Sequence, residues 1–367
     1  MKKLLFLFLL TTAVFLRCSP DKDLEVQVQL YESLRNNELS LIPKNLTNVS
    51  LPDSIDLSGQ IIIKHFDSTI YVFDLDQQFL VRLKPTGEFL NIIGKAGEGP
   101  QELTRVRDFY VFRERISFLR PSGDVSILKT YSTNGDFIEA QNIPVGTSSF
   151  LQLGEDDFIF FTGFNNKEFE YQTYRYQPNR DNLTGVYKHT TDQPKMPLED
   201  YPLIPYLDGF CYWPTYSSSI HFYDDSLNID QFISMDYGPL QLKEEFMEKA
   251  PMEAANYAFD NGFYESRFYL MNQSKLLFSG TWVKSMNEQY PTLTVVDLEN
   301  KRCSTLLMKP GTKDEAYAHF YQIDERYVYS FVDGYALTDN LKESLLGSSD
   351  DLESKSSYYL VKSEYSL

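Results

Sequence analysis

The four histidines of this sequence, His65, His189, His221 and His319, are its first candidates for acid–base or metal chemistry. Metal-binding histidines are commonly spaced as i, i+2 or i, i+4 pairs, and catalytic histidines need a reactive serine or cysteine beside them. None of the four shows either pattern in the sequence. We therefore expect histidines that pack in the fold or face solvent, and we predict no metal and no cofactor.

Adjacent carboxylates could also do chemistry, and three such pairs occur: Asp156-Asp157, Asp224-Asp225 and Asp350-Asp351. All three lie in segments with the composition of turns, where aspartate hydrogen-bonds the local backbone and remains solvated. No catalytic residue is assigned from them.

The glycine-rich segment from Gly94 to Pro100, GKAGEGP, superficially resembles a phosphate-binding loop. It lacks the Gly-Lys-Ser/Thr ending of such loops, and Glu98 would repel a phosphate. A strand-like segment follows it, so no helix N-terminus is available to an anion. We interpret it as a structural turn.

A repeated pattern surrounds this segment and organises the chain. Ile70 is matched by Ile116 at a spacing of 46 residues, and Gly87-Glu88-Phe89 is matched by Gly135-Asp136-Phe137 at a spacing of 48. Each copy contains several alternating, strand-like runs. A repeat of about 45 residues made of short strands is typical of one four-stranded propeller blade.

The remaining strand-like runs can be arranged as six such units. The expected blades cover residues 60–94, 106–142, 149–189, 202–238, 267–308 and 318–365. The sixth has three strands of its own, whereas the strand-like residues 46–52 have no hairpin partner nearby. Propellers commonly close by lending a terminal strand to the blade at the other end. The sequence predicts an all-β fold, a six-bladed β-propeller over residues 46–367 whose last blade is closed by the N-terminal strand.

The loops that join the second and third strands of a blade, or one blade to the next, would lie on one face, and several of them are long. Long loops on a rigid scaffold commonly carry binding residues. Six aromatic residues fall in or next to them and are the candidate ligand contacts: Tyr201, Tyr206, Trp213, Tyr216, Trp282 and Tyr335. Their rings could stack on sugars or anchor a protein partner, or they could pack within the loops.

The N-terminus has the features of an export signal. Lys2 and Lys3 precede an apolar run over residues 4–16, which is shorter than the roughly 20 residues that a membrane-crossing helix needs. Residues 1–17 are predicted to be a signal peptide. The run ends at Cys18 and resembles the lipobox of bacterial lipoproteins, although Arg17 departs from the small residue of that pattern. Residues 18–45 are polar and are expected to form a lipid-anchored tether.

Composition limits the partners. Acidic residues outnumber basic residues 52 to 34, for a net charge of −18, which opposes binding to nucleic acids and anionic membrane surfaces. Contact with a membrane is expected through the lipid anchor only, and the protein is expected to be a monomer. Cys211 and Cys303 lie in different blades and could form a disulfide in an exported protein, but two separately buried thiols are favoured.

Three segments carry a resemblance to a known family: GEFLNIIGKAGEGPQEL, SSSIHFYDDSLNIDQFISMDYGPLQLKEEF and AHFYQIDERYVYSFVDGYAL. Together with the GxxGxGP turn of NHL-type propellers, they resemble the uncharacterised six-bladed β-propeller lipoproteins of Bacteroides-type bacteria. The resemblance covers about residues 46–367. It implies the propeller fold and a cell-envelope location, and it supplies no catalytic residues. From the apolar run that ends at Cys18 we expect a lipoprotein of the outer membrane, and Asp21 and Asp23 favour its exposure at the cell surface.

Two classes of function are compatible with these features. The favoured one is a non-enzymatic binding or scaffold protein of the cell envelope whose ligand is a glycan, a peptide or an envelope protein. The alternative is a hydrolase or lyase whose site is assembled from dispersed residues lining the central channel. Three or more acidic, asparagine or histidine side chains converging at the channel would favour the enzyme.

Overall fold

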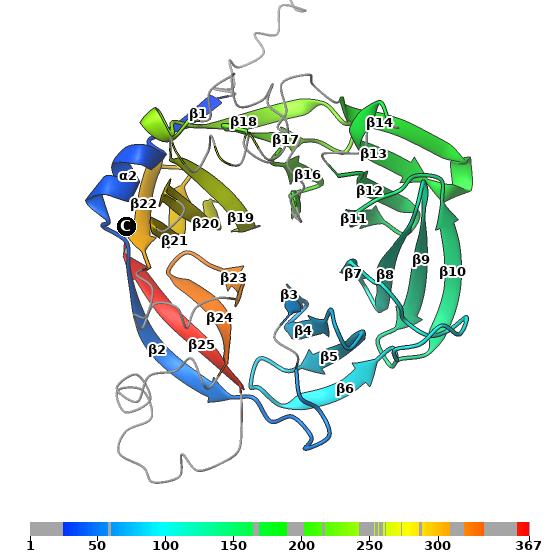
Figure 1. Cartoon of the computed structure of the whole chain (residues 1–367). Helices are drawn as coiled ribbons and strands as arrows, with labels where there is room; N and C mark the ends of the chain where they lie inside the picture. The colour runs from blue at the N-terminus through cyan, green and yellow to red at the C-terminus, as the bar shows by residue number, and fades with distance from the viewer. Residues whose placement is uncertain are drawn as a thin grey trace, which may run out of the picture.

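Six antiparallel β-sheets surround a common centre (Figure 1). The computed structural model describes residues 25–57, 60–163, 169–188, 202–214, 217–241, 262–272, 274–285, 288–308, 319–333 and 358–366, together with residues 253, 256 and 260. Within these ranges each sheet is built from four antiparallel strands, and one sheet carries an additional parallel strand at its edge. The predicted six-bladed β-propeller is confirmed.

Each blade runs from an inner strand at the centre to an outer strand at the rim. Blades 1 to 3 consist of β3 (Ile61–Phe66), β4 (Thr69–Asp74), β5 (Phe79–Leu83) and β6 (Phe89–Ile93); β7 (Asp108–Phe112), β8 (Arg115–Ser122), β9 (Val125–Ser132) and β10 (Phe137–Ile143); and β11 (Ser149–Gly154), β12 (Asp157–Phe161), β13 (Tyr171–Gln177) and β14 (Asn182–Lys188). Blades 4 to 6 consist of β15 (Leu203–Tyr206), β16 (Gly209–Tyr212), β17 (Ser219–Tyr223) and β18 (Ile229–Met235); β19 (Phe263–Met271), β20 (Lys275–Ser285), β21 (Glu288–Asp297) and β22 (Arg302–Leu307); and β23 (His319–Ile323), β24 (Tyr327–Asp333), β25 (Tyr358–Ser366) and one strand from the N-terminus. Two 3-10 turns, η1 (Pro178–Arg180) and η2 (Gly238–Leu240), follow β13 and β18.

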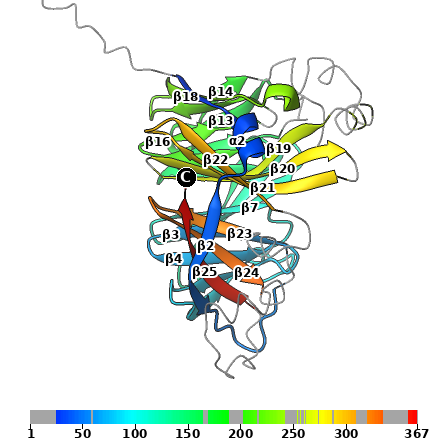
Figure 2. The ribbon, with the colours of Figure 1, turned by 90° about the vertical axis from the view of Figure 1, so that its left-hand side faces the viewer.

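An N-terminal segment, which we call the belt, follows the rim of the ring. It consists of β1 (Glu25–Val28), α2 (Leu30–Asn36) and β2 (Ser40–Asn48). β1 pairs in parallel with β18 of blade 4, α2 packs beside β22 of blade 5, and β2 pairs antiparallel with β25 of blade 6. Figure 2 shows α2 and β2 in succession along the outside of the ring. The belt therefore joins three consecutive blades and provides the predicted closing strand.

Side chains and backbone groups fix the belt to blade 5. Leu30 and Leu34 are fully buried one helical turn apart, and the Ser33 hydroxyl lies 2.7 Å from the Thr305 hydroxyl. The Leu39 N–H donates to the Thr305 carbonyl. Burial of two leucines on one side of a short helix stabilises that helix more than its intrinsic propensity does.

The expected tether over residues 18–45 is corrected from Glu25 onward, because that part of the chain is folded onto the propeller. The closing strand also begins at Ser40, six residues before the expected start at Leu46. Neither feature has a clear signal in the sequence, since Leu30 and Leu34 are the only apolar residues of α2 that are buried. Residues 1–24, including the predicted signal peptide and Cys18, lie outside the described residues.

The glycine-rich segment is a turn between blades 1 and 2, organised by Glu102. The Gly99 N–H donates to Glu102 Oε2 over 2.9 Å, and a Cβ placed on Gly97 would lie only 1.9 Å from the same oxygen. Lys129 donates to the carbonyl of Glu102 and holds the turn against blade 2. The loop encloses the Glu102 carboxylate, which agrees with the interpretation of this segment as a structural turn.

The two cysteines beyond Cys18 are free thiols, Cys211 in β16 and Cys303 in β22. Burial raises the pKa of both, that of Cys303 to about 11. The prediction that Cys211 and Cys303 are separate thiols and form no disulfide with each other is confirmed.

A buried ion pair in blade 5 gives the fold a pH dependence. Lys275 Nζ lies 2.6 Å from Asp297 Oδ2, and both side chains are buried. Burial opposes the charge of Asp297, but hydrogen bonds from Asn300 and Lys275 outweigh it and lower the pKa of the carboxyl to about 2. An unfolded aspartate has a pKa of about 3.9, so this carboxylate stabilises the fold above pH 4, and the stabilisation is lost as the pH falls from about 4 toward 2.

We therefore expect Asp297→Asn to lower the free energy of unfolding by about 2 kcal/mol at pH 7 and by much less at pH 2.5. Urea unfolding at the two pH values measures both. Glu170→Gln is the matched control, because Glu170 pairs with Lys188 at 2.9 Å on an exposed surface. An equal loss at both pH values would show that the charge of Asp297 is not the cause.

Candidate functional site

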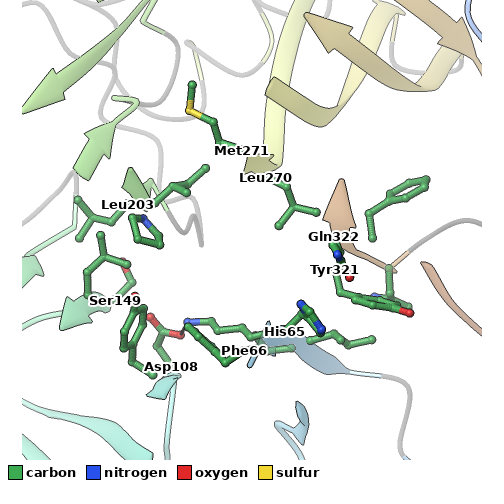
Figure 3. A pocket seen from close by; sticks show the side chains of 18 of the residues that line it. His65, Phe66, Asp108, Ser149, Leu203, Leu270, Met271, Tyr321 and Gln322 are labelled. Carbon is green, nitrogen blue, oxygen red and sulfur yellow. Dashed lines mark hydrogen bonds and ion pairs between the residues drawn. The ribbon is translucent and has the colours of Figure 1, made fainter. Parts of the chain in front are cut away.

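A cavity of about 460 Å³ lies at the centre of the ring (Figure 3). Its lining comes from the inner strand of every blade: β3, β7, β11, β15, β19 and β23. Each of these strands is the edge of its own sheet, so neighbouring blades meet at the centre through side chains and not through a shared ladder. This arrangement leaves room for a ligand, and the volume falls within the range of small-molecule sites.

Lys64 and Asp108 form an ion pair in the wall of the cavity. Lys64 Nζ lies 2.7 Å from Asp108 Oδ1 and also donates to the Phe109 carbonyl. The Asp108 carboxylate accepts two backbone hydrogen bonds, from the Phe109 N–H (2.8 Å) and from the Phe150 N–H (3.1 Å). One carboxylate therefore connects the inner strands of blades 1, 2 and 3.

Burial acts against the charge of this pair. Burial raises the pKa of the Asp108 carboxyl above its ordinary value, and the Lys64 ammonium and the backbone amides offset part of that rise. The ammonium lies 5.1 Å from the centre of the Phe109 ring and 5.7 Å from that of Tyr110, which provides a further favourable contact for the cation. With all these partners in place, we interpret the pair as ionised.

Two of the four histidines line the same cavity, His65 on β3 and His319 on β23. Burial lowers the pKa of both, although Asp67 opposes the shift at His65. Both are therefore neutral at pH 7 and can donate one hydrogen bond and accept another. The His65 ring lies 6.2 Å from the ring of Tyr321 on β23. Gln322, the next residue of β23, also lines the cavity (Figure 3).

The opposite wall is apolar. It consists of Leu203, Ile204 and Pro205 from β15 and of Leu270 and Met271 from β19. In Figure 3, Leu203, Leu270 and Met271 lie across the opening from His65, Phe66 and Asp108. The Met271 sulfur also contacts Cys211 Sγ at 3.5 Å, which supports the wall from behind.

Comparison with known proteins identifies the family. Residues 45–330 match the family DUF5128, described as a 6-bladed beta-propeller. The chain belongs to this family. No curated protein matches the sequence.

Solved structures resemble this DUF5128 propeller at low identity. A protein of Bacteroides fragilis described as exported is 14% identical, with a TM-score of 0.68 over 94% of this chain and 99% of that chain. A protein of unknown function from Bacteroides thetaiotaomicron is 10% identical, with a TM-score of 0.45 over 90% of this chain and 77% of that chain. At 14% identity the likeness to the Bacteroides fragilis protein shows the fold alone.

Three of the six predicted aromatic contacts, Tyr201, Tyr216 and Tyr335, lie outside the described residues. Tyr206 packs edge-to-face on Phe222 at 4.9 Å and borders the core between blades 4 and 5. Tyr206 therefore packs against its neighbours, in line with the alternative hypothesis that the loop aromatics have packing roles.

Trp213 belongs to the core of this propeller. It is 3% exposed, its ring meets Phe278 edge-to-face at 5.1 Å, and its indole N–H donates to the Ser217 carbonyl. A Trp213→Ala substitution would therefore leave a cavity between blades 4 and 5, and the structure gives this residue a packing role.

Trp282 is partly buried near the end of β20, where β20 and β21 are longer than most strands of the propeller. Lys284 lies 4.6 Å from the centre of its ring and 4.7 Å from that of Tyr290. The Tyr290 hydroxyl donates to Glu288, which also pairs with Lys284. Trp282 therefore lies beside a surface cluster formed by Lys284, Glu288 and Tyr290.

The sequence analysis did not identify the cavity-lining residues as a candidate binding site. Lys64 interrupts the apolar run IIIKHF, and Asp108 begins the apolar run DFYVF. A charge inside an otherwise apolar strand is a usable signal, since it requires a partner when buried. The signal does not say which residue that partner is.

Among the described residues, three acidic or histidine side chains line the channel: Asp108, His65 and His319. This is the smallest number expected to favour an enzyme, but Asp108 is already engaged by Lys64 and by backbone amides. Among the described residues, no group of three or more histidine, cysteine, aspartate or glutamate side chains could hold a metal ion. In the same part of the chain, no helix has the length and apolar character to cross a membrane.

Proposed function

We propose that the protein is a non-enzymatic binding protein of the cell envelope, exported and held at the outer membrane by a lipid on Cys18. It takes a small ligand, or one end of a glycan or peptide, into the central cavity. The observation that carries the proposal is the cavity itself, in which Lys64, His65, Asp108 and His319 lie on one side and the described lining of blades 4 and 5 is apolar on the other. Paired-acid hydrolysis needs two carboxyl groups flanking the scissile bond, whereas the described lining contains one, already paired.

The ligand-binding proposal is tested by filling the cavity. Leu203→Trp adds a large side chain to the apolar wall, and Leu183→Trp makes the same change on the exposed outer strand β14. The chain from residue 19, which includes every described residue, is incubated with the small-molecule fraction of the cell envelope, and captured ligand is detected by native mass spectrometry. We expect capture by the unmodified chain and by Leu183→Trp, and at least tenfold less by Leu203→Trp, a loss of about 1.4 kcal/mol or more.

The same experiment can overturn the proposal. Equal capture by the two tryptophan variants, or no capture by the unmodified chain, would remove the cavity as the binding site. Thermal unfolding of both variants confirms that each is folded before the comparison is made.

Export and anchoring are supported by the apolar run that ends at Cys18, and the Bacteroides fragilis relative is itself described as exported. We expect the mature chain to begin at Cys18 with acyl groups attached, because a single chain binds membranes only reversibly and stable anchoring takes more than one. Intact-mass measurement of membrane-extracted protein checks this. Cys18→Ala should move the protein from the membrane fraction to the soluble fraction, and an unmodified mature mass would contradict the anchor.

A further inference from the structure

The charged and histidine side chains of the described cavity lining come from other blades than its wholly apolar part. The described lining residues of blades 4 and 5 are all apolar, and those of blade 5 are Leu270 and Met271, both partly exposed. The charged and histidine side chains that the described lining contains come from blades 6, 1 and 2. His65, His319 and Gln322 are partly exposed there. A ligand in the centre therefore meets hydrogen-bonding groups on one side and hydrocarbon and sulfur on the other.

The cavity also carries no net charge among its described lining residues. Lys64 and Asp108 are the only fully charged side chains among them, and they neutralise each other at 2.7 Å. The two histidines are neutral at pH 7, since burial lowers the pKa of each. This contrasts with the chain as a whole, whose net charge is −18.

We propose that the central cavity selects an uncharged amphipathic molecule, such as a sugar ring that carries an apolar substituent. The apolar substituent lies against Leu270 and Met271, and the hydroxyl groups bond to His65, His319 and Gln322. This inference rests on the proposed function and adds the chemical class of the ligand.

Physical costs exclude the other two classes of small ligand. A charged ligand would lose its hydration without meeting a free opposite charge, because Lys64 and Asp108 are already paired. A wholly apolar ligand would cover the histidines and Gln322 and leave their polar atoms without water or a partner. A molecule with one polar edge and one apolar face avoids both costs.

Two probes that differ in one group test the inference. Phenyl β-D-glucopyranoside is uncharged, and phenyl β-D-glucuronide carries a carboxylate in place of the hydroxymethyl group. Isothermal titration of each into the chain from residue 19 at pH 7.5 measures the dissociation constants. We expect the glucoside to bind at least tenfold more tightly than the glucuronide. Equal affinities, tighter binding of the glucuronide, or no binding of the glucoside at millimolar concentration would overturn the inference.

Variants assign the binding to the two walls. We expect His65→Phe and Met271→Gln each to weaken glucoside binding about fivefold, because one removes a hydrogen bond and the other makes the apolar wall polar. His221→Phe is the matched control: His221 is also partly buried with a pKa lowered by burial, but it lies on β17 of blade 4, packs beside Tyr187 of blade 3 and does not line the cavity.

The outcomes separate this inference from the proposed function. If Leu203→Trp abolishes capture of an envelope ligand while the glucoside does not bind, the cavity is a binding site for another chemical class, and this inference is wrong. If His221→Phe weakens glucoside binding as much as His65→Phe, the probe does not bind in the cavity, and the inference is also wrong.

Discussion

A chain that starts at residue 49 is expected to lose cooperative folding, because it lacks the whole belt. Without β2, the strand β25 becomes an unpaired sheet edge, and the core loses Leu39 and Leu46. Without α2, it also loses Leu30 and Leu34 between blades 4 and 5. Removing a buried leucine side chain costs about 2–5 kcal/mol, so four such losses exceed the total stability of most domains. Circular dichroism during urea unfolding measures the result.

Single substitutions separate the closing strand from the helix. Leu46→Asp places a charge in the core of blade 6, and Leu34→Asp places one beneath α2. We expect both to lower the urea midpoint strongly. Glu38→Ala, an exposed position between the two elements, should leave the midpoint unchanged. If the chain from residue 49 unfolded cooperatively at the normal midpoint, closure by β2 would not be needed for the fold.

The blades could be predicted from the sequence because their signals are local. Alternating strands, short turns and the 46- to 48-residue repeat placed five blades with all their strands, and the unpaired run near Leu46 indicated how the ring closes. The belt before residue 40 could not be predicted in the same way. Its helix has two buried leucines, and β1 is four residues long, so neither has enough periodicity to be recognised without the surface that covers it.

The site was harder to predict because it is assembled across blades. His65 and His319 are far apart in the sequence and line one cavity because blades 1 and 6 are neighbours in the closed ring. Trp213 illustrates the converse limit. Trp213 follows β16 directly and is buried. A shift of one position in the strand register decides whether a residue at a strand end points into the core or toward a loop. The sequence pattern does not determine that shift.

Breaking the Lys64–Asp108 pair is expected to cost the most of any single substitution in the cavity wall. Asp108 is 1% exposed, and its carboxylate accepts hydrogen bonds from three strands. Asp108→Asn keeps the size of the side chain and removes its charge, which leaves the Lys64 ammonium in the wall without a counter-ion. Loss of one partner of a buried pair costs about 3–5 kcal/mol; because the Lys64 side chain is 21% exposed to the cavity, we expect about 3 kcal/mol, measured by urea unfolding.

A double-mutant cycle shows whether the cost comes from the unpaired charge. Lys64→Met combined with Asp108→Asn removes both charges and keeps a long apolar side chain at position 64, so we expect the double variant to be more stable than Asp108→Asn alone. Glu88→Gln is the surface comparison, because Glu88 pairs with Lys84 at 2.8 Å where both side chains are exposed, and it should change stability little. If the double variant lost the sum of the two single losses, Lys64 and Asp108 would act independently, and the pair would not be what holds the inner strands of blades 1, 2 and 3 together around the cavity.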